Sequence, residues 1–215
     1  MPWHDYRVGM QFYDLLSGER CIYRAGRVAG VELLEPRSGD TVLDLGCGTG
    51  LSFDLLVGAV GPTGRVIGVD SSPQMLQLAS RRVARNGWVN VHLVQADASS
   101  LSEEDLVKGT TSTSSDAPQV DAVMSAYSLS VMVDPTAALD QAAKLLTPGG
   151  RLGIVDMQRP TGAAKIFTPL ALMACAFGGS DIDAHPWEWL EKRAQDVRQT
   201  KRRGGHIRVV AGTLP

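Results

Sequence analysis

The chain has 215 residues, 44% of them hydrophobic, and its 21 basic and 23 acidic side chains leave a formal net charge of -2. This balance excludes nucleic-acid binding as the main role, and no apolar run is long enough to span a bilayer. Cys21, Cys47 and Cys175 have neither metal-binding spacing nor an even disulfide framework. We therefore expect free thiols, no metal site and, without a secretory signal, a cytoplasmic location.

Helices and strands are expected to alternate along most of the chain. Residues 3–35 are expected to be helical, with a second helix from about 20 to 34. A strand at 41–45, a helix at 51–60, a strand at 65–69, a helix from Pro73 to Asn86 and a strand at 89–94 follow. After them come a loop at 108–118, a strand at 120–124, a helix from Pro135 to Leu146 and a strand at 151–155. Such alternation is typical of a parallel sheet with helices on both faces.

The end of the chain has a different pattern. Two extended runs at 197–201 and 206–211 flank Gly204-Gly205, which predicts an antiparallel hairpin closing one edge of the sheet. Between the fifth strand and this hairpin, 163–177 is rich in Ala, Leu and Met, and we expect an acceptor-site wall, a buried helix or a dimer contact. The basic run 201–203 is expected to be solvated, and a peripheral membrane contact stays open if the acceptor is a lipid.

The most informative segment is Asp44-Leu-Gly-Cys-Gly-Thr-Gly50, which joins the first predicted strand to the next helix. Ligands of doubly wound sheets bind at the carboxyl ends of strands, where glycines let them approach the backbone. A dinucleotide fingerprint would need a third glycine at the position of Leu51. Asp44 would repel a pyrophosphate and favour a ligand with an ammonium or a sulfonium group. S-adenosylmethionine carries both and has no phosphate.

Two more carboxylates follow the next predicted strands. Asp70 ends the second strand, where a carboxylate can accept both hydroxyls of an adenosine ribose. Asp97 ends the third strand and is placed to accept the amino hydrogens of adenine, with Met75 against the ring. These positions indicate an adenosine-containing ligand.

With these motifs the chain resembles the class I S-adenosylmethionine-dependent methyltransferases over about residues 40–156. Its ends, Phe12-Tyr13-Asp14 and 204–212, resemble the ubiquinone/menaquinone C-methyltransferases and the betaine-lipid N-methyltransferases. The resemblance implies a Rossmann-like three-layer α/β sandwich. Its seven-stranded, mostly parallel sheet would have the order 3-2-1-4-5-7-6 and an antiparallel strand in the terminal hairpin. The donor-binding residues expected on these grounds are Tyr13, Arg24, Asp44, Gly46, Cys47, Gly48, Gly50, Asp70, Ser71, Met75, Asp97, Ala98 and Ser125.

Methyl transfer mainly requires that donor and acceptor are aligned and water is excluded. A base is needed only if the acceptor arrives protonated, so an obvious catalytic residue is not required. The candidates are Tyr127 after the fourth strand, His4 and Tyr6 near the start of the chain, and His185 before an expected helix. Core packing, helix capping or a surface position are the alternatives for these side chains.

We expect one domain over 1–215, with a helical cap at 1–38, a donor-binding core at 39–157, and an acceptor-side insert with the terminal hairpin at 158–215. The expected function is N-, C- or O-methylation of a small-molecule or lipid-like acceptor, by a monomer or a homodimer. A nicotinamide-dependent oxidoreductase is one alternative. A non-catalytic module that binds S-adenosylmethionine is the other.

Overall fold

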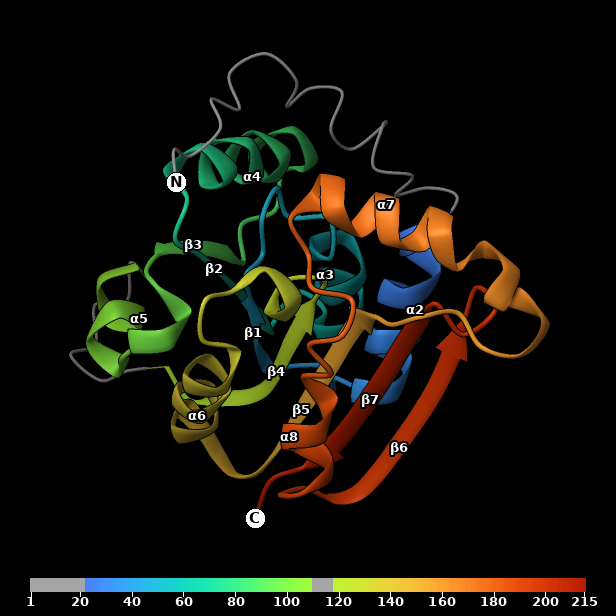
Figure 1. The fold of residues 1–215 in the computed structure, drawn as a ribbon. Coiled ribbons are helices and arrows are strands. Elements are labelled where there is room, and N and C mark those ends of the chain that lie inside the picture. The colour runs from blue at the N-terminus through green and yellow to red at the C-terminus, as the bar shows by residue number, and fades with distance from the viewer. Residues whose placement is uncertain (1–21, 110–117) are drawn as a thin grey trace.

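The computed structural model describes residues 22–109 and 118–215, which build a seven-stranded sheet in the order β3-β2-β1-β4-β5-β7-β6 (Figure 1). Strand β7 runs antiparallel to both β5 and β6, and the other pairs are parallel. This confirms the expected fold class and strand order. The strands are β1 (Thr41–Leu45), β2 (Arg65–Asp70), β3 (Val91–Gln95), β4 (Val120–Ala126), β5 (Leu146–Met157), β6 (Gln195–Arg202) and β7 (Ile207–Thr213).

Helices cover both faces of the sheet and form two apolar cores. One core contains side chains of α2 (Arg24–Leu34), α3 (Phe53–Val60) and α4 (Pro73–Asn86). The other contains side chains of α5 (Glu103–Gly109), α6 (Pro135–Leu145) and α8 (Trp187–Glu191). Helix α7 (Thr168–Gly178) lies across the end of the sheet toward which the parallel strands run (Figure 1). Short 3-10 turns are η3 (Ala98–Ser100), η4 (Leu129–Val131) and η5 (Gly162–Phe167).

Local signals in the sequence set most helix boundaries. The Ser72 hydroxyl accepts the N–H of Met75 at 3.3 Å, and Gly87 ends the same helix with a φ of 66°. Helix α5 was not predicted, although Ser102 and Asp105 form a reciprocal cap at its start. The loop expected at 108–118 was therefore placed two residues too early, because α5 contains Lys108 and Gly109. Its remaining part, 110–117, lies outside the described residues.

Two helical glycines differ in the space around them, which gives a direct test of the packing. A Cβ on Gly30 of α2 would lie 2.5 Å from Cγ2 of Val155, whereas a Cβ on Gly58 of α3 would meet nothing within 4 Å. We expect Gly30→Ala to lower the free energy of unfolding by about 1–3 kcal/mol. Gly58→Ala should raise it by about 0.5–1 kcal/mol, because alanine restricts the unfolded chain. Urea unfolding measures both, and equal effects would contradict the close approach of α2 to β5.

Candidate active site

The loop between β1 and α3 has three glycines in the left-handed backbone region. Gly46, Gly48 and Gly50 have φ angles of 72°, 54° and 78°. A Cβ on Gly46 would lie 2.5 Å from Cβ of Ser128, whereas a Cβ on Gly48 would meet no atom within 4 Å. The Cys47 N–H donates to the carbonyl of Val69 at 2.8 Å and so ties the loop to β2. The loop therefore fits tightly against the protein at Gly46 and leaves its backbone open to a ligand at Gly48.

Cys47 contributes its backbone rather than its thiol to this loop. The side chain is buried, and a Cβ on Gly68 of β2 would lie only 3.0 Å from its sulfur. Burial raises the pKa of the Cys47 thiol well above its usual range, and the carboxylates of Asp44 and Asp70 raise it further. The thiol therefore stays protonated and packs against the sheet.

Asp70 holds the glycine loop from the end of β2. Its carboxylate accepts the N–H of Gly48 and the N–H of Ser72, each at 2.9 Å. Burial raises the pKa of Asp70, while these two bonds work in the opposite direction. Each carboxylate oxygen keeps further acceptor capacity beyond one bond, so Asp70 can also accept hydroxyl groups of a ligand.

Asp44 is the most unusual charged group of this region. It is 1% exposed, and its Oδ2 has no hydrogen-bond partner among the described residues. Burial raises the pKa of Asp44 to about 7, the Arg27 guanidinium works against this shift, and Asp70 adds to it. An unsatisfied buried carboxylate oxygen is costly, so this atom is suited to a ligand group that donates hydrogen bonds.

The residues predicted to bind adenine lie at the same end of the sheet as the glycine loop, where the parallel strands end. Strands β2 and β3 pair in parallel with Asp70 beside Gln95, so Asp97 follows two residues farther on. The Asp97 carboxylate is exposed and accepts the N–H and hydroxyl of Ser99, bonds that lower its pKa. Around it, Ala98 is buried, Met75 is half-buried and Ser71 is exposed.

Two arginines of α2 differ in their surroundings. Arg24 forms an ion pair with Asp54 at 2.7 Å, and both side chains are nearly half exposed. Arg27 donates to the hydroxyl of Ser52 at 3.2 Å, lies 5.0 Å from the centre of the Tyr127 ring and attracts Asp44. Arg27 was missed in the sequence, although it follows Gly26, which marks the face of α2 that packs against the sheet.

Ser125 near the end of β4 and Ser128 just after it hold the end of β1. The hydroxyls of Ser125 and Ser128 donate to the carbonyl of Leu45 at 3.1 and 2.8 Å, and they lie 2.6 Å from each other. Ser125 was expected in the donor site. The structure places it beneath the start of the glycine loop, where both serines are buried.

A second buried carboxylate follows on β5 and was also missed. Asp156 is 0% exposed and accepts the N–H and hydroxyl of Ser130, at 3.0 and 2.8 Å, together with the N–H of Met157 at 2.8 Å. Burial raises the pKa of Asp156 to about 6. An acid inside the apolar run Gly-Ile-Val-Asp-Met was the available signal in the sequence.

A small apolar cluster lies beside these groups, beneath α7. Its buried members come from the end of β5, from α7 and from the chain after it, and Tyr23 and Tyr127 pack against them. Part of the apolar segment 163–177 is therefore core, because α7 turns Ala171 and Cys175 inward. The buried members are Met157, Ala171, Cys175 and Ile182.

The candidate catalytic residues lie in different places. Tyr127 has a φ of 61°, and its hydroxyl donates to the carbonyl of Tyr23 at 2.8 Å, so its proton is engaged there. His185 is exposed and lies 3.7 Å from Glu188 and beside the ring of Trp187. His4, Tyr6 and the expected donor residue Tyr13 lie outside the described residues.

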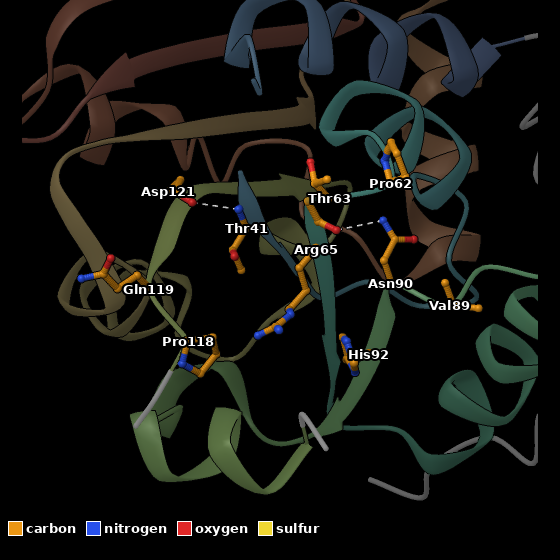
Figure 2. A pocket seen from close by; sticks show the side chains of 11 residues that line it. Thr41, Pro62, Thr63, Arg65, Val89, Asn90, His92, Pro118, Gln119 and Asp121 are labelled. Atoms are coloured by element: carbon orange, nitrogen blue, oxygen red, sulfur yellow. Dashed lines mark hydrogen bonds between the residues drawn. The ribbon is translucent and has the colours of Figure 1, made fainter. Parts of the chain in front are cut away.

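A separate cavity of about 580 Å³ opens at the opposite end of the sheet, where strands β1 and β2 begin (Figure 2). Thr41 and Arg65, which line it, are the first residues of β1 and β2, whereas the glycine loop follows the last residue of β1. Asp121 accepts the N–H of Thr41 at 2.8 Å in its wall. This cavity is therefore not part of the site around the glycine loop.

Comparisons with known proteins agree with this architecture. Residues 36–195 match a family described as "Methyltransferase domain". The chain is 32% identical over 147 residues to an arsenite methyltransferase of Halobacterium salinarum, covering 67% of this chain and 34% of that protein. It is 34% identical over 149 residues to the ubiquinone/menaquinone biosynthesis C-methyltransferase of Pseudomonas putida, covering 69% of this chain and 53% of the relative. The chain thus spans about a third to a half of the length of these two relatives.

A solved structure shares the fold. The S-adenosylmethionine-dependent methyltransferase of Aquifex aeolicus superposes with a TM-score of 0.60 at 17% identity, covering 93% of each chain. The strand order, the glycine loop and the carboxylates at the ends of β2 and β3 together define a Rossmann-like methyltransferase fold. With the match to residues 36–195, the chain belongs to the methyltransferase-domain family.

Neither a metal cluster nor a membrane-spanning helix occurs in the described part of the chain. Within 22–109 and 118–215, no three His, Cys, Asp or Glu side chains gather as a metal site would require. In the same ranges, no helix combines the length and the apolar character that crossing a membrane requires.

Proposed function

We propose that the chain transfers a methyl group from S-adenosylmethionine to a small, apolar or lipid-like acceptor such as a quinone. Relatives named as ubiquinone/menaquinone C-methyltransferase and 2-phytyl-1,4-beta-naphthoquinone methyltransferase, at 34% and 32% identity, support this acceptor class. The arsenite methyltransferase shows that relatives of similar identity act on a different acceptor. The acceptor atom, carbon, nitrogen or oxygen, is therefore part of what must be tested.

The unpartnered oxygen of Asp44 is the observation that carries the proposal. A carboxylate in this position suits an ammonium group, and the Arg27 guanidinium, close enough to attract Asp44, suits a carboxylate. The methionine end of S-adenosylmethionine presents both groups. A pyrophosphate would instead place negative charge beside Asp44, which disfavours the nicotinamide alternative.

The bound donor supplies an activated methyl group, and the residues of this chain supply position. In our proposal Asp70 accepts the ribose hydroxyls, the segment with Asp97 and Ala98 lies against adenine, and the open backbone at Gly48 faces the donor. Tyr127 lies between the donor site and the apolar cluster, and its hydroxyl donates to the carbonyl of Tyr23. Roles for His4, Tyr6, Tyr13 and His185 remain predictions.

The apolar cluster beneath α7 supports a lipid-like acceptor. Met157, Cys175 and Ile182 are buried there, and Tyr23 and Tyr127, whose ring centres lie 5.0 Å apart, pack against the same cluster. Such acceptors dissolve in membranes, so a peripheral membrane contact is part of the proposal. We also propose one domain over 1–215 in the cytoplasm, in keeping with the unpaired thiols of Cys47 and Cys175.

Calorimetry followed by a turnover assay tests the proposal. We expect S-adenosylhomocysteine to bind and NADH to give no heat. With S-adenosylmethionine present, mass spectrometry should then show one added methyl group on a demethylated quinone and none on arsenite. Saturable NADH binding would favour an oxidoreductase. Tight donor binding without turnover of any acceptor would favour a non-catalytic module.

Arg27→Met tests the methionine end of the donor site. We expect about 30-fold weaker binding of S-adenosylhomocysteine, because a charged hydrogen bond to the ligand carboxylate is lost. Binding of 5′-methylthioadenosine, which lacks the amino-acid end, should change less than about threefold. Arg24→Met is the matched control on the same helix, since Arg24 is paired with Asp54. Equal losses of affinity for both ligands would show that Arg27 does not bind the carboxylate of the donor.

A further inference from the structure

The outer face of η5 and α7 carries an exposed apolar surface. Ile166, Phe167, Leu170 and Met173 are 76%, 57%, 59% and 52% exposed, and we call these four residues the apolar ridge. The opposite face of α7 buries Ala171 and Cys175 in the cluster described above. Large apolar side chains gathered on one outer face are typical of an interaction surface.

A group of basic residues lies directly beside the apolar ridge. The end of β6 and the turn that follows it contain Lys201, Arg202 and Arg203, which together we call the basic turn. It contacts the segment leading into the ridge, since Thr161 N–H donates to the carbonyl of Gly204 at 2.9 Å. Figure 1 shows this turn and the chain entering α7 at the same edge of the molecule.

The charged side chains beside the start of α7 are basic, whereas the acids Asp181 and Asp183 follow its end. No Asp or Glu occurs between residues 160 and 180, where Lys165 is the charged residue. Among the residues that the structure describes, no carboxylate forms an ion pair with Lys165, Lys201 or Arg203. The apolar ridge is thus bordered by cations that are available to an external anion.

We propose that the apolar ridge and the basic turn together dock on the surface of a bilayer that contains anionic lipids. Apolar side chains can insert at the boundary between headgroups and acyl chains, and the flanking cations can meet lipid phosphates. The cations beside the ridge favour an anionic bilayer over a second copy of the chain, because a pairing through the ridge alone would not require them.

The docking surface adds to the proposed function and rests on its lipid-like acceptor. Helix α7 presents the ridge outward and Ala171 and Cys175 inward, so one short helix separates the membrane face from the apolar cluster. A lipid-like molecule leaving the bilayer at this helix would meet the cluster beside the donor site without crossing the polar faces of the protein.

Co-sedimentation of the full chain with lipid vesicles tests the surface. We expect binding to vesicles of phosphatidylcholine with phosphatidylglycerol, weaker binding to pure phosphatidylcholine, and release at high salt. Failure to bind the anionic vesicles would overturn the proposal. Dimerisation in solution that depends on the ridge would also overturn it, in favour of a second copy.

Paired variants separate the two parts of the surface. Phe167→Ser with Leu170→Ser should lower vesicle partitioning at least about tenfold, and Lys201→Gln with Arg203→Gln about tenfold. The controls are Val89→Ser, which is 91% exposed elsewhere, and Arg81→Gln with Arg85→Gln on α4; both should stay within about twofold. Controls that lose binding equally would overturn the assignment.

A donor measurement distinguishes this proposal from the proposed function. Calorimetry with S-adenosylhomocysteine should give the wild-type affinity for both surface variants, because neither the ridge nor the turn includes a donor residue. Vesicle binding without quinone methylation would contradict the acceptor class and leave the docking surface standing.

Discussion

Replacing Asp70 with alanine is expected to weaken binding of S-adenosylhomocysteine by at least about 100-fold. The change removes acceptors for the N–H groups of Gly48 and Ser72 and for the ribose hydroxyls, and hydrogen bonds to charged groups are each substantial. Binding of 5′-methylthioadenosine should fall equally, because the ribose is common to both ligands. Calorimetry with the two ligands measures this.

Asp97→Ala is the matched control for Asp70. Its carboxylate is exposed and, among the residues that the structure describes, accepts hydrogen bonds only from Ser99, so the expected loss is about tenfold or less. Circular dichroism should show both variants folded. If Asp70→Ala kept an affinity within about threefold of the wild type, the ribose role of Asp70 would be wrong.

Asp44→Asn should also weaken the binding of S-adenosylhomocysteine about 100-fold, but it should leave the binding of 5′-methylthioadenosine unchanged. The buried carboxylate is expected to hold the ligand ammonium, and an uncharged amide replaces this interaction poorly. Asp54→Asn, an exposed acid on α3, is the control and should leave both affinities unchanged. A loss for both ligands would mean that Asp44 shapes the loop rather than the amino-acid subsite.

The same Asp44 variant should change how stability depends on pH. Burial raises the pKa of Asp44 from 3.8 to about 7, so the folded state holds its proton more tightly than the unfolded state. Such a group stabilises the fold fully at a pH below its pKa in the unfolded state. This contribution is lost as the pH rises toward and through its pKa in the folded state, about 7. Between pH 5.5 and 8 the wild type should lose about 2 kcal/mol more than Asp44→Asn, as urea unfolding can measure.

The sequence predicted the fold well because its signals are local. Short apolar runs marked the five parallel strands of the core, and Gly204-Gly205, with φ angles of 63° and 79°, marked the terminal hairpin. Boundaries were less accurate. Strand β5 begins at Leu146 rather than 151, because Leu146 pairs with Val120 of β4 before a bulge, and regular pairing resumes at Arg151. That pairing depends on a neighbouring strand and leaves no local signal.

The residues proposed for the donor carry clearer signals in the sequence than those beside the apolar cluster. Asp44 and the glycines form one continuous motif, and Asp70 ends the next strand along the chain. Arg27 and Asp156 become part of the region only through the packing of α2 and the pairing of β5. Arg24 was predicted and Arg27 was missed, and only the structure shows that Arg27 attracts Asp44 whereas Arg24 pairs with Asp54.

The short turn η4 joins the two halves of the site mechanically. Ser128 just before it holds the carbonyl of Leu45 below the glycine loop, and Ser130 within it holds Asp156 on the other side. If a bound acceptor displaced Ser130 and this shifted Ser128, the proposed donor and acceptor would alter each other's affinity by the same factor, because such coupling is reciprocal.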